Sequence, residues 1–241
     1  SGMFSAYCEK TEILDDFSIC DEIIVVDSCS TDQTVFLAQQ NPKVKIIQRA
    51  FEDFTKQRNI ALDAAANDWV LFLDGDERIT PELRQEIISE LNRAEKKDAY
   101  YFYRKFYLAG EPVHFSGTQT DKNFRLFRRS KCRYIAEKKV HETLEVKGTT
   151  GVLQNKLLHY SFENFEQFKK KMLYYGLLKG NELAAKGKKY SIISHWSKVV
   201  FKFFKTYFLK LGFLDGINGL KISYLQSLYV NETYRKLKIN K

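Results

Sequence analysis

The sequence lacks the features that mark several common classes of protein. Its four cysteines lie far apart with no paired spacing, at Cys8, Cys20, Cys29 and Cys132. This spacing favours neither a zinc site nor a disulfide framework, so we expect reduced thiols in a cytoplasmic protein. No apolar run reaches the roughly 18 uncharged residues that a membrane-spanning helix needs. No stretch resembles a signal peptide, and no repeats or low-complexity tracts occur.

Hydrophobic residues are abundant enough for a proper core. They make up 44% of the 241 residues, and aromatic residues make up 15%, which excludes a disordered chain. The length fits one large domain, or one domain with a helical appendage. The formal net charge of +9 suggests an anionic partner, which could be nucleic acid, a phosphorylated small molecule or the anionic face of a membrane.

One apolar run ends abruptly in two carboxylates. Residues 69–73 have the length of a buried strand, and Asp74, Gly75 and Asp76 follow directly. Because side chains alternate along a strand, we expect Asp74 and Asp76 to point the same way. Two such carboxylates repel each other unless a cation lies beside them, and a divalent cation carrying a phosphorylated ligand is a common solution. The alternative is an ordinary Asp-Gly turn followed by a solvated Glu77.

The preceding segments predict a βαβαβ order. A β-branched run over residues 22–27 ends in Asp27, and a polar turn leads into a helix over residues 34–40. A strand over residues 44–48 and a helix over about 54–66 come before the run that ends in Asp74. This order implies a doubly wound, mainly parallel sheet whose ligands gather at the strand ends. We therefore expect Asp27 and Asp74 to face one crevice.

Further elements follow along the chain. We expect a helix, an aromatic strand with a hairpin, a second strand and a long helix, at residues 80–92, 99–108, 124–129 and 164–185. The second of these strands carries Arg125, Arg128 and Arg129, with basic side chains on one face. These arginines could bind an acidic acceptor, or they could form a solvated basic face.

The final third of the chain has a different character. Between Trp196 and Phe213, Lys198, Lys202 and Lys205 form a narrow basic stripe on an otherwise apolar predicted helix. Such a helix could dock on the core, or it could lie in a membrane interface with its lysines reaching the headgroups. We favour membrane contact, because so aromatic a surface is costly to leave in water.

Several of these motifs together resemble family 2 glycosyltransferases with a GT-A fold. They occur in the order of that family, at Ala6-Tyr7-Cys8-Glu9, residues 21–34, Gln57-Arg58-Asn59 and residues 71–77. A longer pattern is similar to the lipopolysaccharide-core β-glucosyltransferase subgroup, which adds a hexose to inner-core heptose. That pattern comprises residues 125–129, residues 140–142, His159 and residues 212–216.

The resemblance covers nearly the whole chain and implies its organisation. The fold would be α/β, with a Rossmann-like mixed, mainly parallel sheet flanked by helices and a C-terminal helical extension. The catalytic domain would span residues 1–160, with a nucleotide-sugar half at about 1–98 and an acceptor half at about 99–160. Residues 161–241 would form the helical region.

The chain departs from the family at its first strand. The family has a longer apolar run that ends in a Tyr-Asn-Glu-like sequence. Here only residues 4–7 remain, and Cys8 stands where Asn is usual. Either residues are missing from this edge, or the nucleotide edge of the protein is altered.

For the donor nucleotide, the resemblance implies a UDP-sugar. Asp27 would accept a hydrogen bond from the uracil imide, close to the backbone of Ala6 and Tyr7 and to Glu9. Arg58 would contact the base or the diphosphate, where a planar cation suits an anion.

For the metal, the resemblance implies Mg²⁺ or Mn²⁺. Asp76 would coordinate the ion, which would bridge the two phosphates and neutralise the leaving UDP. Asp74 would bind the ribose or a metal-bound water. His159 would complete the metal shell or touch the diphosphate, and the alternative is a core histidine near a helix start.

Glu142 is the expected catalytic base. An inverting transferase needs one group to take the proton of the acceptor hydroxyl, and Glu142 occupies the place of the family's acid before an acceptor-side helix. The alternative is a surface glutamate in a basic segment. The implied reaction is transfer of a hexose to a lipopolysaccharide-core-like or lipid-linked sugar. The enzyme would be peripheral on the inner face of the cytoplasmic membrane, with an anionic membrane surface and no nucleic acid as partner.

Two other functions agree with parts of the sequence. One is a phosphatase with an aspartyl nucleophile, although Arg78 replaces its usual Thr, and Asp27 and Arg58 would have no role. The other is a basic non-enzymatic module that binds nucleic acid or an anionic membrane. Against nucleic acid, the acidic residues gather at strand ends, where they would repel phosphate backbones.

Overall fold

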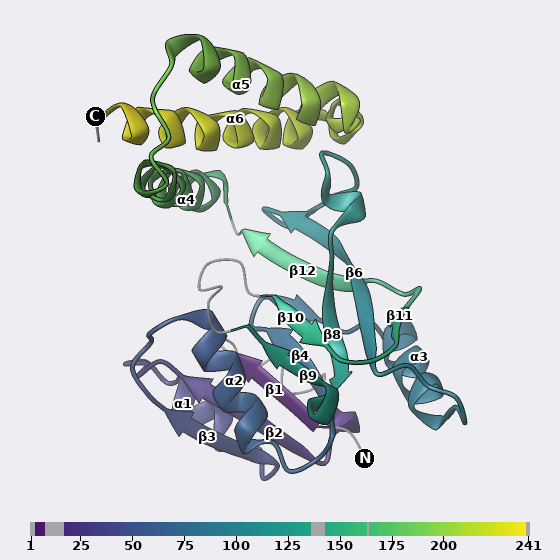
Figure 1. Cartoon of the computed structure of the whole chain (residues 1–241). Helices are drawn as coiled ribbons and strands as arrows, with labels where there is room; N and C mark the ends of the chain where they lie inside the picture. The colour runs from purple at the N-terminus through teal and green to yellow at the C-terminus, as the bar shows by residue number, and fades with distance from the viewer. Residues whose placement is uncertain (1–2, 8–16, 136–142, 163, 240–241) are drawn as a thin grey trace. The chain divides into compact units, whose positions relative to one another are not determined.

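The chain folds as two compact units. The computed structural model describes residues 3–7, 17–135, 143–162 and 164–239. One unit comprises Ser1–Arg104 and Lys122–His159, and the other comprises Lys105–Asp121 and Tyr160–Lys241. The first unit is rich in strands and the second in helices (Figure 1). The domain boundary at residue 160 stays a prediction.

The first unit is built on four parallel strands in the order β3-β2-β1-β4. They span Val44–Gln48, Glu22–Asp27, Met3–Tyr7 and Trp69–Asp74. In β1, Ala6 pairs with Val25 of β2 and with Leu73 of β4, so the carboxyl ends of these three strands lie at one edge. Helices α1 (Thr34–Ala38) and α2 (Phe54–Ala64) connect the strands, and α2 lies over one face of them (Figure 1). The predicted βαβαβ order is confirmed.

The composition of β2 and β4 explains why they are central. Both strands bury side chains on both faces, as parallel strands between two layers require. Val25 and Leu71 pack into one apolar cluster, whereas Ile24 and Val70 pack into another. Helix α3 (Pro81–Asn92) begins as its sequence predicts, because the Thr80 side chain accepts a hydrogen bond from the amide of Leu83.

The sheet continues beyond β4 with antiparallel strands. These are β8 (Lys122–Arg128), β6 (Ala99–Leu108), β12 (Leu157–Phe162) and β5 (Glu77–Arg78). Strand β11 (Thr150–Val152) pairs with β6, and β9 (Cys132–Tyr134) and β10 (Leu144–Val146) form a separate pair. The register between β6 and β8 skips Arg125, because Tyr100 pairs with Leu126 and Tyr101 pairs with Phe124. Such irregularities commonly re-aim a side chain beside a functional site.

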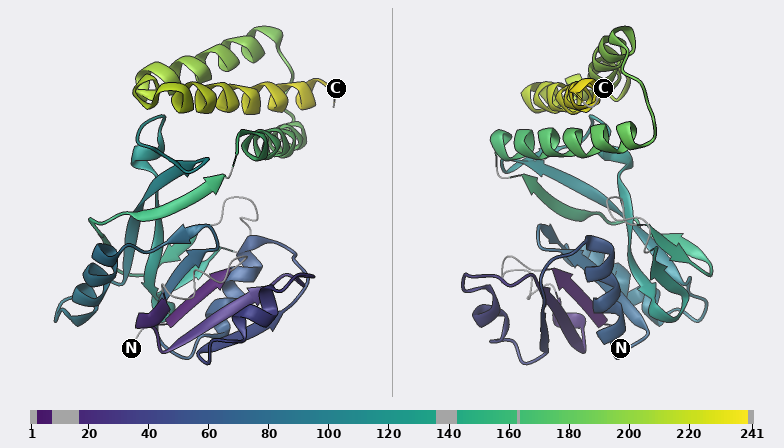
Figure 2. Two further views of the ribbon diagram at one scale, coloured as in Figure 1. Left: turned by 180° about the vertical axis from the view of Figure 1, so that it is seen from behind. Right: turned by 60° about the vertical axis from the view of Figure 1, so that its left-hand side comes forward.

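The second unit joins a hairpin to three helices. The end of β6 pairs with β7 (Glu111–Val113), which confirms the predicted hairpin. Helix α6 (Gly216–Ile239) packs along both α4 (Phe165–Ala185) and α5 (Ile192–Phe204) (Figures 1 and 2). Gly176 and Gly180 allow the close approach of α4 to α6, since a Cβ there would lie 2.8 Å from Glu232 Cβ and 2.6 Å from Lys236 Cβ.

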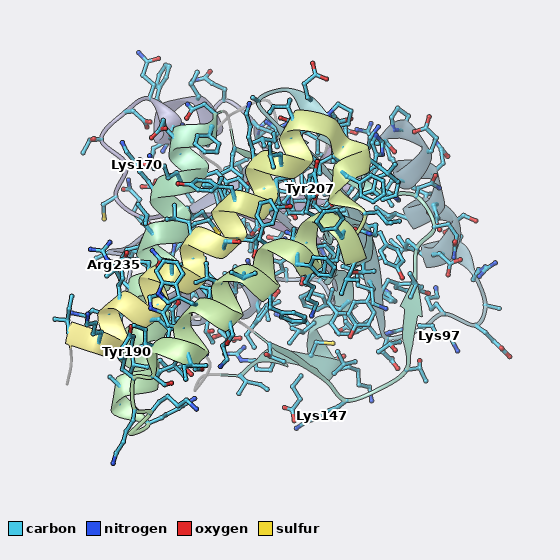
Figure 3. The ribbon with its side chains drawn as sticks, turned by 90° about the horizontal axis from the view of Figure 1, so that it is seen from above. Lys97, Lys147, Lys170, Tyr190, Tyr207 and Arg235 are labelled. Atoms are coloured by element: carbon cyan, nitrogen blue, oxygen red, sulfur yellow. The ribbon has the colours of Figure 1, made fainter. Side chains whose placement is uncertain are left out.

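The predicted helix over residues 196–213 is wrong at its C-terminal end, after Leu209. Helix α5 ends at Phe204, and a π-helical segment follows at Lys205–Leu209. Leu211 then adopts a positive φ of 57°, and the 3₁₀ helix η5 (Gly212–Asp215) leads into α6. Viewed from above, Tyr190 and Tyr207 lie near opposite ends of α5 (Figure 3). No helix among the described residues is both long enough and apolar enough to cross a bilayer.

Candidate active site

The sheet presents two aspartates at its carboxyl edge. Asp27 ends β2 and Asp74 ends β4, with β1 between them. Two strand spacings separate their positions, which is roughly 10 Å. In β1, Ala6 and Tyr7 pair with Leu73 and Asp74, so their backbone lies at the same edge. The structure therefore brings together the strand ends that the sequence predicted to share a crevice.

Asp27 is a buried carboxylate held by hydrogen bonds. The Ser30 amide donates to Oδ2 at 3.0 Å, and the Ser30 hydroxyl donates to Oδ1 at 2.5 Å. Gln48 Nε2 donates to Oδ2 at 3.3 Å. Burial alone would raise the pKa of Asp27, but these hydrogen bonds outweigh it and lower the pKa below its ordinary value. Asp27 is therefore a fixed, ionised acceptor.

Both carboxylate oxygens of Asp74 accept hydrogen bonds from arginines. Arg58 Nη2 lies 3.0 Å from Oδ1, and Arg125 Nη2 lies 2.5 Å from Oδ2. Burial would raise the pKa of Asp74, but the positive charges of Arg125 and Arg58 outweigh it and hold the pKa well below its usual range. The Arg58 guanidinium also lies over the rings of Phe72 and Tyr134, at 5.9 and 5.4 Å from their centres.

The Gln57-Arg58-Asn59 motif ties α2 to three parts of the first unit. Gln57 Nε2 donates to the Ser28 hydroxyl at 3.0 Å, which holds the loop after Asp27. Asn59 Nδ2 donates to the Tyr134 carbonyl at 3.0 Å, and the Tyr134 amide donates back to Asn59 Oδ1 at 3.2 Å. Gln57 and Asn59 therefore fix the helix that carries Arg58 to the loop after Asp27 and to β9.

A buried ionic cluster lies behind Asp74. Glu77 is fully buried and accepts hydrogen bonds from Arg125 Nη2 at 2.7 Å, from Arg104 Nη1 at 3.3 Å and from the Asp74 amide at 3.0 Å. Arg125 is only 2% exposed. A buried carboxylate is tolerated when it has such partners. A solvated Glu77 is therefore wrong, and so are both alternatives for Arg125, because this side chain faces neither solvent nor an acceptor.

The other two arginines of the predicted basic strand also have internal partners. Arg128 lies over the Trp69 ring, 4.9 Å from its centre, and its Nη1 lies 3.4 Å from Asp68 Oδ2. Arg129 donates to the carbonyl of Ala65. These contacts hold β8 to the segment before β4. The positions of both arginine side chains are therefore explained without a bound glycan acceptor.

Asp76 and His159 lie together in the turn after β4. Strand alternation does not apply to Asp76, because β4 ends at Asp74 and a turn follows. Asp74 and Asp76 accordingly have different partners. The alternation of side chains along a strand therefore gives no reason to expect these two carboxylates to point the same way. His159 Nε2 lies 3.2 Å from Asp76 Oδ2, and the Asp76 side chain is 39% exposed.

These two side chains fit part of a metal site. Within the described ranges, no group of three or more His, Cys, Asp or Glu side chains is arranged to hold a metal ion. Mg²⁺ in nucleotide sites is commonly bound by one or two carboxylates, with the remaining positions filled by phosphate oxygens and water. Asp76 supplies one such carboxylate, and His159 would add an imidazole nitrogen beside it. Glu9 and Glu142 lie outside the described residues, so their roles stay predictions.

The chain is similar in sequence to known glycosyltransferases. It is 29% identical over 219 residues to an uncharacterized glycosyltransferase of Rickettsia felis, in a match that covers 84% of this chain and 75% of that protein. It is also 29% identical over 203 residues to the lipopolysaccharide core biosynthesis glycosyltransferase LpsC of Rhizobium meliloti, covering 82% and 73% of the two chains.

Solved structures of TarS from Staphylococcus aureus align with the chain at low identity. A TarS structure in complex with UDP covers 98% of this chain and 92% of that chain at 15% identity, with a TM-score of 0.49. In a second TarS structure the match covers 73% of this chain but only 40% of that chain, at 18% identity and a TM-score of 0.47.

The family model described as glycosyl transferase family 2 matches residues 14–144, which is more than half of the chain. The predicted α/β fold with a C-terminal helical extension is the one observed. The match also confirms the predicted enzyme class, so the non-enzymatic alternative is wrong. The chain belongs to glycosyl transferase family 2, as its ordered motifs indicated.

Proposed function

We propose that this enzyme transfers a hexose from a UDP-sugar to a cell-surface glycan acceptor, with inversion and with a divalent metal. The observation that carries the proposal is the row of carboxylates at one edge of the sheet. Asp27 is fixed by hydrogen bonds, Asp74 is held by two arginines, and Asp76 is exposed beside His159. These are three different environments, which suits three different roles.

In the proposed donor site, the chain binds and orients the nucleotide. The ionised carboxylate of Asp27 accepts the imide N–H of uracil. The spacing of roughly 10 Å from Asp27 to Asp74 suits a nucleoside that spans both strand ends, with its ribose at Asp74. Arg58, which pairs with Asp74 at 3.0 Å, would contact the base or the diphosphate, where a planar cation suits an anion.

Asp76 and His159 would hold Mg²⁺ or Mn²⁺ together with oxygens of the diphosphate. When bound, the metal stabilises the negative charge of the leaving UDP. Glu142 would take the proton of the acceptor hydroxyl as that oxygen attacks the anomeric carbon from the side opposite UDP. The name of LpsC supports a lipopolysaccharide-core-like acceptor, and a lipid-linked sugar is the related alternative.

A panel of UDP-sugars, assayed for transfer and for hydrolysis, tests this reaction. We expect UDP release that requires Mg²⁺ or Mn²⁺ and stops on chelation. Glu142→Gln should lower kcat by roughly 10²- to 10⁴-fold, the usual contribution of a general base, and should leave UDP binding unchanged.

Glu145→Gln is the matched control, because Glu145 is an exposed glutamate on β10 and should tolerate the change. Wild-type turnover by Glu142→Gln would remove Glu142 from the mechanism. Absence of turnover with every UDP-sugar and both metals would contradict the proposed donor.

A further inference from the structure

The second unit contains a cavity that no step of the proposed reaction uses. Its volume is about 210 Å³. The β6–β7 hairpin and the loop after it form one wall, α5 with its π-helical extension forms another, and α6 completes it. Much of the lining is aromatic or aliphatic, but Lys202, Lys210 and Gln226 also line the cavity. A mostly apolar cavity with a few convergent polar groups is the usual form of a ligand site.

The two cavity lysines form no ion pair with any residue that the structure describes. Asp121 is the acidic residue of the cavity lining. Burial lowers the pKa of Lys202, and the positive charges of Lys210 and Lys205 lower it further. Half-buried ammonium groups that repel each other are unfavourable on their own. A bound anion would relieve both the desolvation and the repulsion.

The backbone that carries these lysines has unusual geometry. The π-helical turn Lys205–Leu209 lies between them, and such turns occur frequently at functional sites. Leu211 and Ser116 have φ values of 57° and 61°, in the left-handed region that non-glycine residues rarely adopt. Conformations of this kind persist where the surrounding structure enforces them, as it does around ligands.

Hydrogen bonds hold this frame in place. The Ser116 amide donates to the Lys210 carbonyl at 3.0 Å. Asp215 accepts hydrogen bonds from the amides of His114 and Phe115, both at 2.9 Å. Gly117 leaves room for a lysine, because a Cβ there would lie 2.4 Å from Lys210 Nζ. The Lys210 side chain therefore runs close along a rigid loop.

We propose that this cavity binds a phosphate group through Lys202 and Lys210. A lysine ammonium is a compact charge that suits phosphate, and Gln226 adds an amide donor. Every residue of this cavity belongs to the second unit, and none of them is a residue of the proposed donor site. The phosphate belongs either to a phosphorylated sugar of the acceptor or to a phospholipid headgroup.

Phosphate binding to the full chain can be measured directly by calorimetry, with inorganic phosphate as the probe and chloride as the competing anion. We expect saturable binding that weakens at least about tenfold in Lys202→Met and in Lys210→Met, because each removes a charged hydrogen-bond donor. Lys189→Met is the matched control, since it removes the same charge from an exposed position in the same unit. It should bind phosphate as the wild type does.

A melting experiment provides an independent readout. Methionine keeps most of the lysine stem, so both cavity variants should fold, and without phosphate they should melt at or above the wild-type temperature. Phosphate should raise the melting temperature of the wild type and of Lys189→Met more than that of either cavity variant. No binding by the wild type, or an equal loss in all three variants, would overturn the proposal. UDP binding by the same variants should not change, which separates this site from the donor site.

Two further probes distinguish the sources of the phosphate. If a sugar phosphate such as mannose 6-phosphate binds more tightly than inorganic phosphate and depends on both lysines, the site serves the acceptor. If only phosphatidylglycerol vesicles show that dependence, the site serves a headgroup. If the binding of none of these probes depends on Lys202 or Lys210, the site is refuted.

Discussion

Arg125 connects the acidic groups at the end of β4, and its removal should be costly. It pairs with Asp74 and with the fully buried Glu77. Arg125→Met should lower the free energy of unfolding by roughly 3–5 kcal/mol, because it leaves a buried carboxylate short of its main partner. Urea unfolding measures this change.

Arg133→Met is the control for that experiment. Arg133 also pairs with an aspartate, Asp63, but both side chains are at least half exposed. Exposed pairs contribute about 0–1 kcal/mol, so the control should remain close to the wild type. Equal losses in the two variants would contradict the buried cluster.

The lowered pKa values of Asp27 and Asp74 predict a loss of stability in acid. The unfolded chain takes up these protons at a higher pH than the folded protein does, so the stabilisation is present above the unfolded pKa of about 4 and is lost as the pH falls through the folded pKa. Asp74→Asn should be less stable than the wild type at neutral pH. The gap should shrink below about pH 5. A gap that does not change with pH would contradict the role of these charges.

Local sequence was sufficient to predict the positions of some residues of the candidate site and not of others. Asp27, Arg58 and Asp76 stand at strand ends or in a recognisable helix motif, so their positions could be predicted. The pairing of Glu77 with Arg125 could not be predicted, because the two residues are 48 positions apart in the chain and meet only when β5 and β8 fold into one unit. A glutamate after an Asp-Gly turn has the same local pattern whether it is buried or exposed.

Among the elements, the strands were easier to predict than the end of α5. Apolar runs identify β2 and β4 because both faces of these strands must be covered. Lysines at helical spacing between residues 196 and 213 suggested one continuous helix. The π-helical turn and the positive φ of Leu211 interrupt it. The chain then packs back closely on this turn, since a Cβ at Gly212 would lie 2.8 Å from the Thr206 carbonyl oxygen.

Asp215 should control the loop between β7 and η2 (Thr118–Thr120). Its carboxylate accepts the amides of His114 and Phe115 and lies 3.2 Å from the Ser116 hydroxyl. Asp215→Ala should therefore speed hydrogen exchange at those two amides and lower the stability of the second unit by roughly 1–3 kcal/mol. Glu166→Ala, at an exposed position of α4, should leave this exchange unchanged. Unchanged protection in Asp215→Ala would show that other contacts hold the loop.

At the scale of the whole molecule, the positive charge gathers in the second unit. Residues 183–214 contain seven lysines and no acidic residue, and this stretch includes α5. Exposed apolar side chains share that helix, with Ile193 80% exposed and Phe201 56% exposed. We propose that this surface binds the anionic face of a membrane, since interfacial helices combine these two features.

Vesicle co-sedimentation tests the membrane proposal. Binding should require anionic lipid and weaken with salt, and Ile193→Ser with Phe201→Ser should reduce it by at least about tenfold, because each loses the burial of several carbons. Phe36→Ser removes an equally exposed phenylalanine from the first unit and should have no effect. Equal binding by all variants would refute this surface.

The most direct test of the central claim is the melting temperature with UDP and Mn²⁺. The account predicts that UDP at about a hundred times its Kd, with Mn²⁺, stabilises the wild type by about 2.7 kcal/mol and raises its melting temperature by several degrees. Asp76→Ala should lose this shift while melting normally without ligand. If the wild type shows no shift, or if Asp76→Ala keeps the full metal-dependent shift, the proposed donor site is wrong.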